Sequence, residues 1–176
     1  MITVLKHLPR TLGPRALAIA ILLVGSAALA GTLPAPQERS ILEVTGKITN
    51  TNAGNRAQFD LPMLEKLGIS RLKTATAWTE GKPVFEGVLV RDLFNQVGAS
   101  GEKVTVVALN DYKVDIPMSD FKNFPVILAY RMDGQALRVK DKGPLWIIYP
   151  ADDFPELNNK QTQNKWVWQV KEIQIN

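Results

Sequence analysis

Apolar residues in this chain recur mainly in short alternating or continuous runs, a spacing typical of β-strands. Ile41–Ile48 and Tyr112–Ile116 alternate between apolar and polar residues, which predicts strands with one buried face. Val104–Leu109 is a continuous apolar run, which predicts a strand covered on both faces, and Leu145–Tyr149 is apolar throughout. The hydrophobic pattern therefore predicts a domain in which strands dominate.

Turn residues divide the second half of the chain into further strands. Val126–Met132 and Gln135–Val139 flank the dipeptide Asp133-Gly134, and this arrangement predicts a tight hairpin. In Trp166–Ile175 the apolar residues change phase at Lys171-Glu172, which predicts a β-bulge or a bend in the last strand.

Helices are expected to be few and short. Asp60 can cap a helix that Gly68 ends, since glycine adopts the left-handed conformation without strain. A second amphipathic helix is expected from Asp92 to Gly98, and a single helical turn over Asp120–Asn123. Short helices among many strands predict an α+β fold, rich in mixed and antiparallel sheet.

The first residues have the pattern of a targeting segment. Residues 1–30 combine a basic start, the apolar run Ala16–Val24 and the small residues of Ala28-Leu29-Ala30, which is typical of a cleaved secretory signal peptide. An uncleaved membrane anchor is the alternative, although the apolar stretch is shorter than a bilayer span requires. We therefore expect an extended lead-in over 31–40, one domain over 41–176, and a periplasmic or secreted location.

Composition excludes several kinds of chemistry. The chain has no cysteine, and its single histidine, His7, lies in the leader. The expected mature chain then lacks thiol and imidazole, which removes cysteine nucleophiles, histidine bases and nearly all types of zinc site. The leader also holds three of the 21 basic residues and none of the 17 acidic ones, so little net charge remains. Nucleic-acid binding therefore has little support, and membrane contact is expected only through an uncleaved leader.

Several short motifs occur in an order that resembles a known family. Together they resemble the molybdopterin-binding oxidoreductases of the sulfite-oxidase type. The motifs are Phe85–Phe94, Ala129–Gly134, Gly143–Leu145 and Lys165-Trp166. The resemblance extends from about Leu42 to Ile175. It implies a sulfite-oxidase-like fold, a molybdopterin cofactor, and molybdenum held through a cysteine thiolate.

Two positions depart from what the resemblance implies. The segment expected to end at the metal-binding cysteine reads Lys73–Trp78, within an expected strand over Arg71–Trp78, and it offers only threonine hydroxyls. A hydroxyl keeps its proton near neutral pH and cannot replace a soft anionic ligand. Trp146 stands near the position where an arginine would meet the cofactor phosphate, with one N–H donor and no charge. We therefore expect no working molybdenum site, although molybdopterin binding remains possible by family resemblance.

The candidate ligand-binding residues come from four parts of the chain, and most have a plainer structural alternative. Trp78 and Trp146 could form an aromatic wall or belong to the core. Arg131 could bind an anion or pair with Asp111 or Asp133, and polar groups near residue 110 could simply shape a turn. The full candidate set is Thr76, Trp78, Asn110, Tyr112, Arg131 and Trp146. The acidic loop after Pro150 is expected to be solvated and to hold no metal.

Three functions remain open from sequence. The chain could be an exported molybdopterin-dependent oxidoreductase, as the resemblance implies. It could be a cofactor-free module that binds a small ligand, or a partner subunit of a membrane signalling protein. The missing thiolate favours the second and third over the first, because fold alone does not fix activity.

Overall fold

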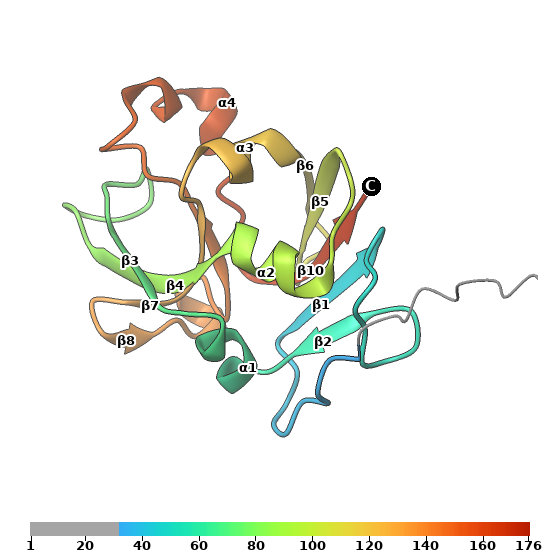
Figure 1. Ribbon diagram of the computed structural model, residues 1–176. Coiled ribbons are helices and arrows are strands. Elements are labelled where there is room, and N and C mark those ends of the chain that lie inside the picture. The colour runs from blue at the N-terminus through green and yellow to red at the C-terminus, as the bar shows by residue number, and fades with distance from the viewer. Residues whose placement is uncertain (1–31) are drawn as a thin grey trace, which may run out of the picture.

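The computed structural model describes residues 32–176, which form two β-sheets with short helices between and beside them (Figure 1). The expected signal peptide over 1–30 lies outside the described residues. Within 32–176, none of the helices has the length and apolar content needed to cross a membrane.

The first sheet joins strands from both ends of the described chain. Its order is β2 (Ala57–Phe59), β1 (Leu42–Gly46), β10 (Val170–Ile175), β5 (Lys103–Ala108) and β6 (Lys113–Pro117). β1 and β10 run parallel, with Val44 opposite Ile173, and the other neighbours are antiparallel. The register of β10 against β5 shifts between Val170 and Glu172, which confirms the expected bulge.

The second sheet is antiparallel and is centred on β7. Its strands are β3 (Ser70–Lys73), β4 (Val84–Leu89), β7 (Ile127–Met132), β8 (Gln135–Ala136) and β9 (Trp146–Ile148). One edge of β7 pairs with β4, and the other is shared by β8 and β9. The expected hairpin at Asp133-Gly134 is confirmed, because β7 and β8 pair across it.

The helices are short, and the first three lie where the sequence predicts helices. They are α1 (Leu61–Lys66), α2 (Val90–Val97), α3 (Met118–Asn123), α4 (Lys160–Gln163) and the 3-10 turns η1 (Val139–Asp141) and η2 (Pro155–Leu157). Asp60 caps α1 by accepting a hydrogen bond from the Met63 backbone N–H, as expected. Gly98 ends α2 in the left-handed conformation, with φ of 62°.

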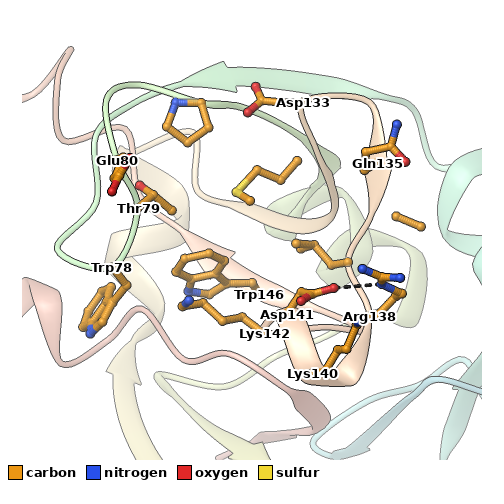
Figure 2. A pocket seen from close by; sticks show the side chains of 14 residues that line it. Trp78, Thr79, Glu80, Asp133, Gln135, Arg138, Lys140, Asp141, Lys142 and Trp146 are labelled. Carbon is orange, nitrogen blue, oxygen red and sulfur yellow. Dashed lines mark hydrogen bonds and ion pairs between the residues drawn. The ribbon is translucent and has the colours of Figure 1, made fainter.

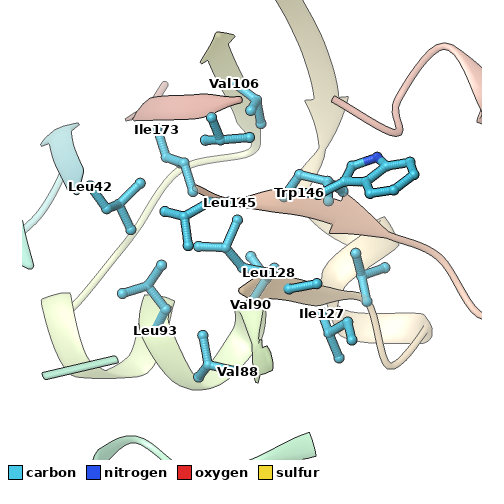
Figure 3. Packing of buried hydrophobic residues seen from close by; sticks show 14 of the residues in the cluster. Leu42, Val88, Val90, Leu93, Val106, Ile127, Leu128, Leu145, Trp146 and Ile173 are labelled. Carbon is cyan, nitrogen blue, oxygen red and sulfur yellow. The ribbon is translucent and has the colours of Figure 1, made fainter. Parts of the chain in front are cut away.

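The core fills the space between the two sheets and α2. Figure 3 shows Leu42, Ile173 and Val106 of the first sheet facing Leu128 of the second, with Leu93 of α2 beside them. These side chains are fully buried. The mixed, strand-rich sheets and short helices confirm the expected α+β fold class.

Three details differ from the sequence expectation. The strand expected over Arg71–Trp78 ends at Lys73, because the following residues form a turn. The return strand expected over Gln135–Val139 ends at Ala136, and Val139 begins the 3-10 turn η1. Trp166 and Trp168 precede β10 and share no strand with it, although Trp168 forms an isolated bridge with Trp146.

Candidate functional site

A pocket of about 620 Å³ opens between the loop that carries Trp78 and the β7–β8 hairpin (Figure 2). Its wall continues through the 3-10 turn η1 to Trp146, the first residue of β9. The pocket thus gathers residues from segments that are far apart in sequence, including two of the predicted site residues.

Trp78 is positioned by a small hydroxyl network. Thr76 Oγ1 accepts a hydrogen bond of 3.0 Å from the Trp78 backbone N–H and lies 2.9 Å from Thr79 Oγ1. These bonds stabilise the turn that replaces the expected strand, as serine and threonine hydroxyls commonly do. Thr76 therefore supports Trp78, and its hydroxyl is occupied by protein groups.

All four tryptophans of the chain meet in one cluster. The ring centroid of Trp78 lies 5.2 Å from that of Trp168, 6.2 Å from that of Trp166 and 6.3 Å from that of Trp146. Trp146 is fully buried, and its Nε1–H donates to the Trp166 carbonyl at 3.2 Å. Trp146 is thus a core residue at the floor of the pocket, whereas Trp78 is only partly buried.

Charged side chains of both signs surround the pocket mouth. Arg138 Nε lies 2.8 Å from Asp141 Oδ2, as the dashed line in Figure 2 shows. Lys142 Nζ lies 5.6 Å from the centroid of the Trp146 ring, a cation–π distance. Lys140 and Glu80 also line the pocket. The segment Lys140–Lys142 therefore forms part of the pocket wall.

Asn110 and Tyr112 lie on a second cleft, of about 330 Å³, which shares Trp78 with the first pocket. Asn110 Oδ1 accepts a hydrogen bond of 3.2 Å from the Tyr112 backbone N–H, so the turn geometry expected from sequence is present. The Tyr112 side chain nevertheless remains exposed at the cleft. Of the predicted site residues, Trp146 lines the first pocket, Asn110 and Tyr112 line the second cleft, and Trp78 lines both. Thr76 lines a separate, smaller cavity of about 240 Å³.

Arg131 lines neither cavity, and the ion-pair partners suggested for it from sequence need correction. Arg131 Nη2 lies 2.9 Å from Glu65 Oε1, and its guanidinium carbon lies 5.3 Å from the Tyr130 ring centroid. An ion pair was expected, but with Asp111 or Asp133. Those carboxylates have other partners, since Asp111 pairs with Lys171 and Asp133 accepts from a backbone N–H. The partner was missed because α1 approaches β7 through tertiary packing, which short-range patterns do not encode.

The donor atoms do not fit a thiolate-held molybdenum. The chain has no cysteine, and residues 32–176 contain no grouping of three histidine, cysteine, aspartate or glutamate side chains that could hold a metal ion. Thr74 is fully buried, and its hydroxyl donates only a long hydrogen bond of 3.4 Å to the Ala75 carbonyl. Since a threonine hydroxyl stays protonated near neutral pH, neither it nor Thr76 supplies the anionic ligand that the family resemblance implies.

Comparison with known proteins identifies the family. The family model for the oxidoreductase molybdopterin binding domain matches residues 39–171, and the chain belongs to this family. No curated protein sequence matches the chain.

Among solved structures, the fold is similar to the sulfane dehydrogenase SoxCD from Paracoccus pantotrophus, with a TM-score of 0.56 and 19% sequence identity. The match covers 76% of this chain and 37% of that chain, so this chain spans well under half of the SoxCD chain. The family and the sulfite-oxidase-like fold expected from sequence are thereby confirmed.

Proposed function

We propose that this protein is an exported member of the molybdopterin-binding family that binds a small ligand or a signalling partner instead of catalysing molybdenum redox chemistry. The observation that carries the proposal is the Lys73–Trp78 segment. It offers only Thr74, which is buried, and Thr76, whose hydroxyl bonds to protein groups, where the resemblance implies a thiolate. The segment instead presents Trp78 between two cavities.

The cavities around Trp78 support a binding role. The larger one, about 620 Å³, lies within the range of roughly 300–1,000 Å³ that is usual for small-molecule sites. It combines an indole surface with side chains of both charges, so it can orient a ligand by stacking and by polar contacts.

Elemental analysis tests the absence of molybdenum chemistry. Protein purified from its native compartment is expected to contain molybdenum far below one atom per chain, and to give no pterin fluorescence after acid denaturation. One molybdenum per chain together with a released pterin would overturn the proposal.

The alternative function is a molybdopterin-dependent oxidoreductase, favoured by the family match over residues 39–171. On this alternative the cofactor itself would supply all the sulfur ligands of the metal. A Thr74→Cys variant is informative here. If the protein naturally binds the cofactor without a thiolate, the wild-type chain and the variant should acquire equal amounts of the cofactor.

Export is proposed on the leader pattern of residues 1–30. Cell fractionation with intact-mass measurement should find a periplasmic or secreted form that lacks about the first 30 residues. A full-length form in the membrane fraction would favour the uncleaved anchor, and a cytoplasmic full-length form would contradict export.

A further inference from the structure

The second cleft is lined by aromatic rings that solvent can reach. Tyr112 is 52% exposed, and Trp78 and Trp168 are only partly buried. All three line the same cleft, together with the buried Trp166. Since Trp146 is wholly buried at the first pocket, accessible ring surface is concentrated in the second cleft.

The polar groups of this cleft are carboxamides. Asn110, Gln163 and Asn164 line it, and no charged side chain does so among the described residues. The first pocket, by contrast, is lined by six charged side chains. A carboxamide offers a donor and an acceptor side by side, so it can pair with the edge of a heteroaromatic ring. It carries no positive charge to balance the negative charge of a phosphate or a carboxylate.

The cleft also borders a donor that has no protein partner. Trp166 Nε1 is buried and makes no hydrogen bond within residues 32–176. A buried N–H without a partner is uncommon and costs stability. This N–H has almost no exposed surface, so it is an unsatisfied polar group beside the cleft and not a group that a ligand in the cleft contacts directly.

We propose that this cleft binds an uncharged heteroaromatic ring with amide-like edges, of the purine type, by stacking on Tyr112 and Trp78 and pairing with the carboxamides. The inference rests on the proposed binding function and specifies its ligand class. Because the cleft has no cation, the uncharged base or nucleoside should bind at least as well as its phosphorylated form.

Adenosine is a suitable probe, with adenosine monophosphate and glucose as comparators. Titration calorimetry of the full chain should show saturable binding of adenosine, equal or weaker binding of the monophosphate, and no binding of glucose. Tyr112→Ala should weaken adenosine binding roughly fivefold or more, because an aromatic platform under a base is lost. Asn164→Ala should also weaken it. Both side chains are exposed, so their loss should leave the fold intact.

A matched control is Lys140→Ala, which changes only the first pocket and should leave adenosine binding unchanged. Absence of adenosine binding to a folded, molybdenum-free chain would overturn this inference while leaving the proposed function standing. Tighter binding of the monophosphate or of glucose would also overturn it. Stoichiometric molybdenum would instead contradict the proposed function, whatever adenosine does.

Discussion

At the scale of single residues, Asp60 holds two segments of backbone together. Its carboxylate accepts hydrogen bonds from the N–H groups of Gln37, Glu38 and Met63, at 2.7–2.9 Å. Burial alone would raise the pKa of Asp60, but the bonds from Glu38, Met63 and Gln37 outweigh it and hold the pKa below its ordinary value. The residue thus anchors the lead-in segment to the start of α1.

Replacing Asp60 by alanine should lower the free energy of unfolding by about 2–4 kcal/mol, because a helix cap and two further charge-assisted hydrogen bonds are lost. The native pKa is depressed, so the stabilisation is present above the unfolded pKa, near 4, and is lost as pH falls through the native value. Urea unfolding at pH 7 and at pH 3 measures both effects. Asp60→Asn is the control, and it should retain part of the cap but show a weaker pH dependence.

The two tryptophans of the first pocket should respond differently to truncation. Trp146→Ala should cost about 3–5 kcal/mol, because a fully buried indole leaves a cavity. Trp78→Ala should cost about 1–2 kcal/mol, since its ring is already partly solvated. Urea unfolding measures both values from the shift in midpoint, provided that the dependence of the unfolding free energy on urea concentration stays the same. Equal losses would show that Trp78 is as much a core residue as Trp146.

Sequence alone could place Trp78 and Trp146 in one candidate site, but not their separate roles. The resemblance located both positions, whereas burial depends on Trp166 and Trp168, which come from another segment. The convergence of four tryptophans is a tertiary feature without a local signal. For the same reason, the sequence could not separate the cavity of Trp146 from that of Asn110.

At the scale of secondary-structure elements, β4 and β7 approach each other unusually closely at Gly87. A Cβ on Gly87 would overlap the Leu128 carbonyl oxygen and lie 2.6 Å from Ala129 Cα. The register of β4 shifts at the same point, between Glu86 and Gly87. Glycine therefore permits the close approach at the bulge, where Tyr130 of β7 has no partner in β4.

A methyl group at Gly87 should be costly, because the atoms it meets are backbone and cannot turn aside. Gly87→Ala is expected to lower the free energy of unfolding by on the order of 3 kcal/mol, as overpacking does. Gly81→Ala is the matched control, with open space around it and φ of 61°, and should cost only about 1 kcal/mol. Similar midpoints in thermal unfolding for the two variants would contradict the steric explanation.

Elements with a local signal were predicted well, and elements defined by pairing were not. The cap at Asp60, the end of α2 at Gly98 and the bulge in β10 each follow from a few adjacent residues. The division of the strands into two sheets follows from partners more than 100 residues apart, such as Val44 and Ile173. Such pairing is set by the whole core and leaves little trace in short patterns.

At the scale of the whole molecule, a polar cluster joins the helix α3 to the segment between β9 and β10. The Tyr149 hydroxyl and Lys165 Nζ both donate to Asp120 Oδ2, at 2.9 Å and 2.8 Å. Burial, together with the Asp120 carboxylate, raises the pKa of the Tyr149 phenol well above its usual value, so it remains a donor. The cluster connects parts of the chain that follow different sheets.

Asp120→Asn should destabilise the fold by about 2–3 kcal/mol, because Lys165 and Tyr149 lose a shared anionic acceptor. Lys165→Met, which keeps the apolar stem, should cost less. The double variant should cost less than the sum of the two, since the groups share one interaction. Additive losses in a double-mutant cycle would show that they act independently.

The position of β10 in the first sheet has a consequence for the order of events during biosynthesis. Every other strand is made before β10, yet β10 lies between β1 and β5. The ribosome must therefore synthesise the chain as far as residue 175 before the first sheet can close. Until then, β1 and β5 lack the strand that lies between them. We therefore expect the first sheet to close only at the end of synthesis, whereas all strands of the second sheet are available earlier.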